Sequence, residues 1–148
     1  MNTGAALRRF GLCGGAQDGA RLGSDPLGAL IAELSEAARS PGVNASGLLS
    51  TQAAAEIFAE RRVRARAVRD GTAKRDPKAF VRIATGPVRT EELGRLVANA
   101  IGTTRPLEER LALFWANHFM VSTVRTAIGA MVGAYEREAL RPQMLGRF

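Results

Sequence analysis

The sequence has only one cysteine, Cys13, and only one histidine, His118. A single cysteine cannot form an intrachain disulfide, and it cannot supply the pair of thiolates that structural zinc sites commonly use. With one histidine and one distant cysteine, the chain is also poor in the ligands that transition metals prefer. The sequence therefore predicts no disulfide-stabilised fold and no metal site, and it indicates no cofactor.

Aromatic residues are also scarce, at 5% of the chain. The apolar residues are mainly Ala, Leu and Val, which suit packed helices better than a sheet rich in aromatic and β-branched residues. No apolar run is long enough to span a membrane. No export signal is visible, because the polar and glycine residues 13–19 follow Arg8 and Arg9 where an apolar segment would be required. We expect an all-α protein; its location is not indicated by the sequence, and cytoplasmic is the default.

The net charge of +7 comes almost wholly from arginine, since Lys74 and Lys78 are the only lysines. A bias toward arginine can arise without any anionic partner, so the charge alone is weak evidence for nucleic acid. The glycine-rich segment 1–24 does not match a phosphate-binding loop, because it lacks the preceding strand and the closing Lys-Ser/Thr pair. These features do not favour nucleic acid as a partner.

Helix signals predict an irregular array of about five helices. Asp25, Ser50 or Thr51, and Thr90 are capping residues for three of them, and Pro106 begins a fourth. We expect a glycine-rich amino-terminal segment over 1–24, helices within 25–70, a mobile linker over 71–89 and a further helical segment over 90–148. The individual helices are predicted at 26–39, 51–70, 91–101, 106–122 and 127–140.

Apolar residues recur at three- and four-residue steps over 106–122 and again over 127–140. The first of these patterns places Trp115 and His118 on the face that is directed toward the core. We therefore expect His118 to be largely buried within an unbroken helix, with Trp115 in the core beside it. The connection between the two helices is short, which predicts that they pack as neighbours. On the second helix the spacing predicts that Arg137 points outward.

A buried imidazole must find a hydrogen-bond partner, and Glu138 and Tyr135 are the candidates from the second helix. The favoured interpretation is a structural histidine in the core. The alternative is a general base formed by His118 with Glu136 or Glu138, since carboxylates often orient histidines in catalytic sites. His118, Glu136 and Glu138 are therefore weak catalytic candidates.

Two stretches carry a family resemblance. They are PLEERLALFWANHFMVS, residues 106–122, and YEREALRPQMLGRF, residues 135–148. Both closely resemble the bacterial family called domain of unknown function 1800, and the opening Arg9-Phe10-Gly11-Leu12 is similar to the start of that family. The motif residues in this chain are Phe114, Trp115, Asn117, His118, Phe119, Tyr135, Glu136, Arg137, Glu138, Arg141 and Pro142.

The resemblance implies a longer parent. Family chains are several times longer and continue into further helices, so residues 1–148 are expected to be the amino-terminal fragment of a larger helical domain. Many relatives carry histidine where this chain has Ala116, and some carry histidine where it has Gln143, so any role of those histidines is reduced here. Several apolar residues lack evident partners, which predicts marginal stability of the isolated chain. They are Leu113, Met120, Met144, Leu145 and Phe148.

Three functional hypotheses follow. The leading one is an uncharacterised structural or interaction module, whose partner is the missing carboxy-terminal part or another protein. The second is a contribution to an enzyme whose catalytic groups lie mostly in that missing part, and for this chain itself an enzyme is not the favoured interpretation. The third is weak nucleic-acid binding through the cluster Arg61–Arg69, which lacks interleaved aromatics and any known motif.

Overall fold

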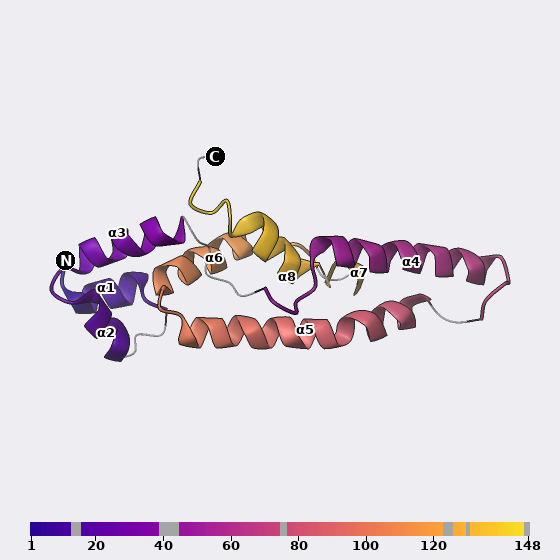
Figure 1. Ribbon diagram of the computed structural model, residues 1–148, viewed down its shortest axis with the longest axis horizontal. Coiled ribbons are helices and arrows are strands. Elements are labelled where there is room, and N and C mark those ends of the chain that lie inside the picture. Colours follow the sequence, from indigo (N-terminus) through magenta and orange to yellow (C-terminus); the bar gives the residue numbers. More distant parts are fainter. Residues whose placement is uncertain (13–15, 39–44, 75–76, 123–125, 130, 147–148) are drawn as a thin grey trace. The chain divides into compact units, whose positions relative to one another are not determined.

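The computed structural model describes residues 1–12, 16–38, 45–74, 77–122, 126–129 and 131–146. Within these residues the chain is helical and contains no strand, which confirms the all-α prediction (Figure 1). The elements are α1 (Thr3–Phe10), α2 (Ala16–Leu22), α3 (Pro26–Ala37), α4 (Thr51–Arg69), α5 (Pro77–Gly102), α6 (Pro106–His118), α7 (Thr126–Gly129), α8 (Val132–Tyr135) and the π-helical turn η1 (Glu136–Leu140).

The chain forms two compact units, each assembled from segments that are distant in the sequence. Unit 1 comprises residues 1–44, 96–119 and 139–148. Unit 2 comprises residues 45–95 and 120–138. The boundary falls within α5, so this helix contributes its first part to unit 2 and its last part to unit 1.

The glycine-rich amino-terminal segment contains two helices that the sequence did not predict, α1 and α2. Asn2 caps α1, because its side-chain oxygen accepts a hydrogen bond from the backbone N–H of Ala5 at 2.7 Å. The last residue of α2, Leu22, is buried in the core of unit 1. The glycine-rich segment is therefore helical over 3–10 and 16–22, because burial and capping outweigh the low helix propensity of glycine.

Most of the predicted linker 71–89 is instead the first part of α5, which begins at Pro77 and continues through Pro87. An interior proline ordinarily costs a helix about 3 kcal/mol. Val81 and Thr85, one turn apart, are both buried, and the Thr85 hydroxyl donates to the carbonyl oxygen of Val81 at 2.8 Å. Burial of this face stabilises the helix across the proline, so the prediction of a linker, and of a cap at Thr90, was wrong.

The core of unit 1 lies among α1, α2, α3 and α6. Each of these helices contributes a buried apolar residue to the cluster: Ala6, Leu22, Leu30 and Leu107. Asp25 begins α3 as predicted, accepting a hydrogen bond from the N–H of Gly28 at 3.0 Å, and Pro26 occupies the first turn. Partly buried side chains surround this cluster: Leu7, Phe10, Ala29, Leu34 and Leu111.

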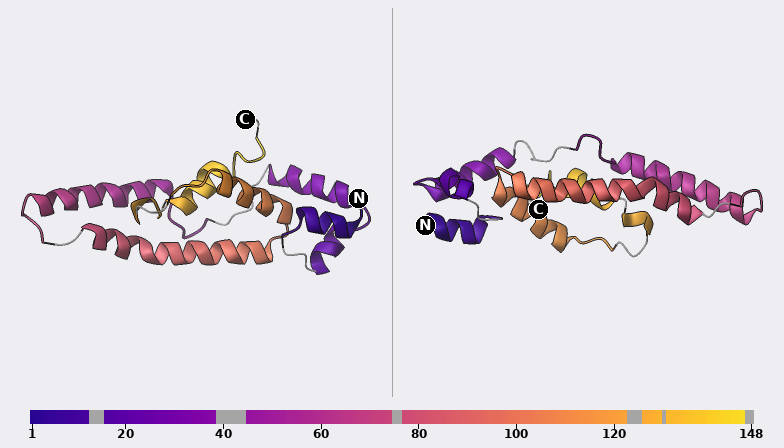
Figure 2. Two further views of the ribbon diagram at one scale, coloured as in Figure 1. Left: turned by 180° about the vertical axis from the view of Figure 1, so that it is seen from behind. Right: turned by 90° about the horizontal axis from the view of Figure 1, so that it is seen from below.

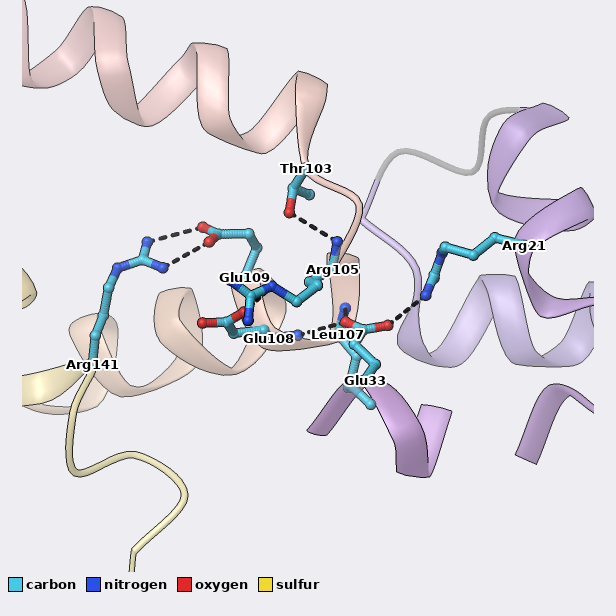
Figure 3. Close-up of polar contacts among 8 residues, drawn as sticks. All are labelled: Arg21, Glu33, Thr103, Arg105, Leu107, Glu108, Glu109 and Arg141. Atoms are coloured by element: carbon cyan, nitrogen blue, oxygen red, sulfur yellow. Dashed lines mark hydrogen bonds and ion pairs between the residues drawn. The ribbon is translucent and has the colours of Figure 1, made fainter. Parts of the chain in front are cut away.

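The first turn of α6 is capped by a side chain from a different helix. Arg105 occupies the capping position and makes no side-chain cap hydrogen bond. Instead, one carboxylate oxygen of Glu33, from α3, accepts hydrogen bonds from the backbone N–H groups of Leu107 at 2.6 Å and Glu108 at 3.0 Å (Figure 3). The other oxygen of Glu33 accepts from Arg21 at 2.7 Å. The helix dipole and the guanidinium both stabilise this buried anion.

Two further carboxylates in the same turn are buried with arginine partners. An oxygen of the Glu108 carboxylate, Oε2, lies 3.0 Å from Nε of Arg105. Glu109 accepts two hydrogen bonds from Arg141, at 2.7 and 2.9 Å, and both of these side chains are only 2% exposed (Figure 3). This bidentate pair joins α6 to the carboxy-terminal segment of unit 1, in which Met144 is also buried.

Unit 2 contains α4 and the first part of α5, which run side by side (Figures 1 and 2). Ser50, one of the two residues predicted to cap α4, is its cap: the Ser50 side chain accepts a hydrogen bond from the N–H of Ala53 at 3.1 Å. Gly71, with a φ of 75°, follows the end of the helix, where the left-handed region favours glycine. The guanidinium of Arg64 lies over the ring of Phe80, 4.2 Å from its centroid, and links the two helices.

The two helices of the recognised motif are shorter than predicted. Pro106 begins α6 as expected, but the helix ends at His118 and not at residue 122. The predicted helix 127–140 is represented by α7, α8 and η1, and it does end before Arg141 and Pro142 as predicted. That the two segments pack as neighbours stays a prediction.

In the part of the chain that the structure describes, no helix is both long enough and apolar enough to cross a membrane. The longest helix, α5, contains charged residues throughout its middle, among them Arg89, Glu91 and Glu92.

The buried pair between Glu109 and Arg141 generates a stability prediction. Arg141→Met leaves the Glu109 carboxylate buried without its partner, and we expect the free energy of unfolding to fall by about 3–5 kcal/mol. The double variant E109L/R141M removes both charges and should recover most of that loss. Urea unfolding followed by circular dichroism measures both, with Arg9→Met on the exposed surface of α1 as the control. A loss of less than about 0.5 kcal/mol in R141M would contradict the prediction.

Candidate functional site

The helix α6 changes from fully enclosed to exposed along its length. Its first four residues, 106–109, are all buried, although they point in every direction around the helix. From Leu113 onward most side chains are exposed, with Phe114 at 58% and Phe119, the residue that follows the helix, at 41%. We call Leu113, Phe114, Trp115, His118 and Phe119 the aromatic end of α6.

Four rings at the aromatic end form two parallel pairs, each four residues apart. Phe114 and His118 are stacked with 11° between their planes and 6.1 Å between their centroids. Trp115 and Phe119 are stacked with 13° between their planes and 5.5 Å between their centroids. Edge-to-face contacts join one pair to the other, as between Phe114 and Trp115 at 5.2 Å. Such contacts contribute about 0.5–1.5 kcal/mol each beyond area burial, so the rings hold one another in place.

The prediction that His118 is buried in the core was wrong. His118 is exposed, and it is the last residue of α6. Phe119 caps the helix, with its backbone N–H bonded to the carbonyl oxygen of Trp115 at 2.8 Å. Trp115 is half-buried, and Asn117 is exposed.

The error has a physical reason that Leu111 illustrates. Leu111 lies on the same predicted stripe as Trp115 and His118, and it packs against the core of unit 1. Periodicity identifies which face of a helix is apolar, but it does not say how far along the helix the neighbouring helices reach. Here α1 and α3 contact α6, and the burial ends about two turns after its start.

A second part of the motif, Glu136–Glu138, makes contacts within unit 2. Arg137 was predicted to point outward, but its side chain is only 8% exposed. It is ion-paired with Glu92 of α5, and it donates a hydrogen bond to the carbonyl oxygen of Leu49 at 2.7 Å. One guanidinium therefore connects the carboxy-terminal segment of unit 2 to α5 and to the residues before α4.

The neighbouring carboxylate, Glu138, caps α4. Both of its oxygens lie 3.2 Å from the backbone nitrogen of Thr51, the first residue of that helix. An anion at a helix amino terminus is stabilised by unpaired N–H groups and by the helix dipole. Glu138, proposed from the sequence as a weak catalytic candidate, thus serves as a structural cap in this arrangement.

The backbone around these contacts is tightly packed. A methyl group added at Gly133 would overlap the carboxylate of Glu92, the same group that pairs with Arg137. The residues 136–140 then adopt a π-helical turn, which adds a residue to the turn relative to an α-helix. Tyr135 and Glu136 are half-buried beside it, and Arg141 continues into unit 1.

The three catalytic candidates divide between the units: His118 belongs to unit 1, whereas Glu136 and Glu138 belong to unit 2. Among the described residues, no group of three or more His, Cys, Asp or Glu side chains could hold a metal ion. Cys13 and Phe148 lie outside the described residues. In the part of the chain that the structure describes, the side chains brought together therefore form ion pairs and an aromatic surface, and not a catalytic cluster.

The buried contacts of Glu33 with α6 and of Glu109 with Arg141 were missed by sequence reasoning. Their partners are far apart in the chain: 74 residues separate Glu33 from the N–H of Leu107, and 32 separate Glu109 from Arg141. The only local signal was the pair Glu108 and Glu109 within an apolar helix, which also fits an ordinary first turn favoured by the helix dipole.

Residues 5–148 match a family model described as "Protein of unknown function (DUF1800)", so the chain belongs to this family. The match covers the aromatic end of α6, the contacts of Arg137 and Glu138, and the ion pairs of unit 1 described above. The chain has no match among curated proteins or among solved structures.

The packing at Gly133 generates a second prediction. Gly133→Ala should lower the free energy of unfolding by about 1–3 kcal/mol, because the new methyl group displaces the Glu92 carboxylate from Arg137. Gly94→Ala is the matched control, since nothing lies within 4 Å of the methyl position and alanine favours a helix. We expect G94A to raise stability by about 0.5–1 kcal/mol. Equal effects of the two substitutions in thermal or urea unfolding would refute the steric explanation.

Proposed function

The chain belongs to the family of proteins of unknown function DUF1800, and we propose that it acts as a helical interaction module. In this module the aromatic end of α6 packs against further polypeptide. The observation that carries the proposal is the exposure of this end. Monomeric proteins rarely leave several large apolar side chains exposed side by side unless they form an interaction site.

The composition of this surface suits a protein contact. Between Leu111 and Phe119 the only ionisable side chain is His118. Aromatic residues are enriched at the centres of protein interfaces, and charged residues are depleted there. The ring contacts order the side chains in advance, which lowers the entropy cost of binding.

The size of the surface favours one kind of partner. Phe114 and Phe119, exposed by 58% and 41%, together leave the area of about one whole aromatic side chain uncovered. That is roughly 150–250 Å². Even with Trp115 and His118 added, the surface is smaller than the roughly 800 Å² per partner of a stable complex between separate proteins. A small contact of this kind is effective between parts of one chain, where association does not cost translational freedom.

We therefore propose that the partner is a further helical part of the same domain, in the longer proteins that the sequence resembles. In this role residues 1–148 form its amino-terminal part. The rigid attachment of the first turn of α6 through Glu33 and Glu109 supports the proposal, because it holds the aromatic end in a constant position.

The proposal predicts how the isolated chain behaves toward apolar probes. It should bind the dye ANS, and F114S/F119S should lower that binding by at least about half while the helix content by circular dichroism stays unchanged. Ile31→Ser is the matched control, because Ile31 is an exposed apolar residue of α3 in the same unit, 56% exposed. It should leave dye binding nearly unchanged.

The fluorescence of Trp115, the only tryptophan of the chain, reports directly on binding at the aromatic end of α6. Its emission should shift to shorter wavelength when the carboxy-terminal part of a longer family member is added, and F114S/F119S should abolish the shift. A wild-type chain that binds no ANS, or one whose Trp115 emission does not respond to that part, would overturn the proposed function.

A further inference from the structure

The second half of α4 carries five arginines, and helix geometry divides them between two faces. They are Arg61, Arg62, Arg64, Arg66 and Arg69. At about 100° per residue, positions 62, 66 and 69 fall within about 60° of one another. Position 64 lies about 140–160° from each of these three on the same basis. We call Arg62, Arg66 and Arg69 the arginine stripe.

Arg64 belongs to the face that packs within unit 2. Its guanidinium lies over the ring of Phe80 in α5, and its Nε donates to Glu60 at 2.9 Å. This arginine is therefore engaged by both an aromatic face and a carboxylate. Its direction also fixes that of the arginine stripe, which lies on the side of α4 opposite to the contact with Phe80.

The arginine stripe is exposed and nearly free of carboxylates. In the described part of the chain, Arg62 and Arg69 have neither an ion pair nor a hydrogen bond to their side chains. Arg66 lies 3.8 Å from Asp70, but these two side chains are 78% and 54% exposed. An ion pair so long and so exposed contributes little. The three guanidinium groups are thus available to an external anion.

We propose that the arginine stripe binds the phosphate backbone of double-stranded nucleic acid. Seven residues of α-helix, from position 62 to position 69, rise about 10.5 Å. The same length covers about three successive phosphates of one strand, at 3.4 Å of axial rise each. Guanidinium groups bind phosphate oxygens in a bidentate manner, and the net charge of +7 favours the encounter. Since phosphates carry no sequence information, binding is independent of sequence.

Other anionic surfaces fit less well. An amphipathic helix that lies on a membrane needs a broad apolar face, and Val63 is the only large exposed apolar residue of α4. Proteins that bind single strands supply aromatic side chains for base stacking, and residues 62–69 contain none. The duplex backbone is the partner that the spacing and composition favour. The proposal is independent of the aromatic end of α6, because α4 belongs to unit 2.

The test is a titration of the full chain against a labelled DNA duplex of mixed sequence, about 20 base pairs long, followed by fluorescence anisotropy. Three phosphate contacts predict that the logarithm of the association constant falls with the logarithm of salt concentration with a slope of about −2.7. R62Q/R69Q should reduce the slope to about −0.9 and weaken binding at least tenfold at low salt. Glutamine preserves helix propensity, so α4 should remain folded.

The matched control is R8Q/R9Q, which removes the same charge from exposed positions of α1 in unit 1. It should leave the slope unchanged. Equal losses in R62Q/R69Q and R8Q/R9Q would show that binding follows net charge alone, and would overturn the proposal. So would the absence of any binding at low salt. Polyglutamate that competes with the duplex at equal charge concentration would also overturn it, in favour of an acidic protein as the partner.

Discussion

The carboxylate of Glu33 holds unit 1 together, because three helices, α2, α3 and α6, meet at it. It caps α6 from the neighbouring helix α3, accepting the N–H groups of Leu107 and Glu108, and it binds Arg21 of α2. A buried carboxylate is costly unless its oxygens are satisfied, and here both oxygens have donors. The same interaction explains why α6 needs no capping side chain of its own at Arg105.

Because α6 is attached at its amino-terminal end, its carboxy-terminal end is exposed but held in place. The side chains of the first turn are buried and bonded to neighbouring elements. The last turns of α6 extend beyond the helices that pack around the first turn, so their side chains are exposed. The aromatic end is therefore exposed but not mobile relative to its own helix, since Phe114 and Trp115 stack on the residues one turn later. The ring contacts and the exposure of this end are the basis of the proposed interaction surface.

Capping residues in the sequence were sufficient to predict where several helices begin. The caps at Asp25 and Ser50 and the start of α6 at Pro106 were all predicted, because each rests on residues within one turn. Long-range packing decided the rest. The helix runs through Pro87 because Val81 and Thr85 are buried, and nothing in the neighbouring sequence indicates that burial.

The same holds for the candidate site. The sequence identified the motif residues, but the contacts of Arg137 and Glu138 are made with residues elsewhere in the chain. Arg137 bonds to the carbonyl oxygen of Leu49, 88 residues earlier, and Glu138 caps Thr51, 87 residues earlier. Without that information an arginine between two glutamates resembles any solvated face of a helix.

These separations also have a consequence for the order in which the protein is completed on the ribosome. Unit 1 begins with residues 1–44 but also requires residues 139–148, and unit 2 requires residues 120–138. At about 5–20 residues per second, the first segment waits roughly 5–20 s for its last contact partner to be synthesised. Throughout that interval α4 lacks its cap at Thr51, and Glu109 lacks Arg141. The core of unit 1 can therefore assemble once α6 has been made, whereas Glu109 and the amino terminus of α4 gain these partners only when translation of this region is nearly finished.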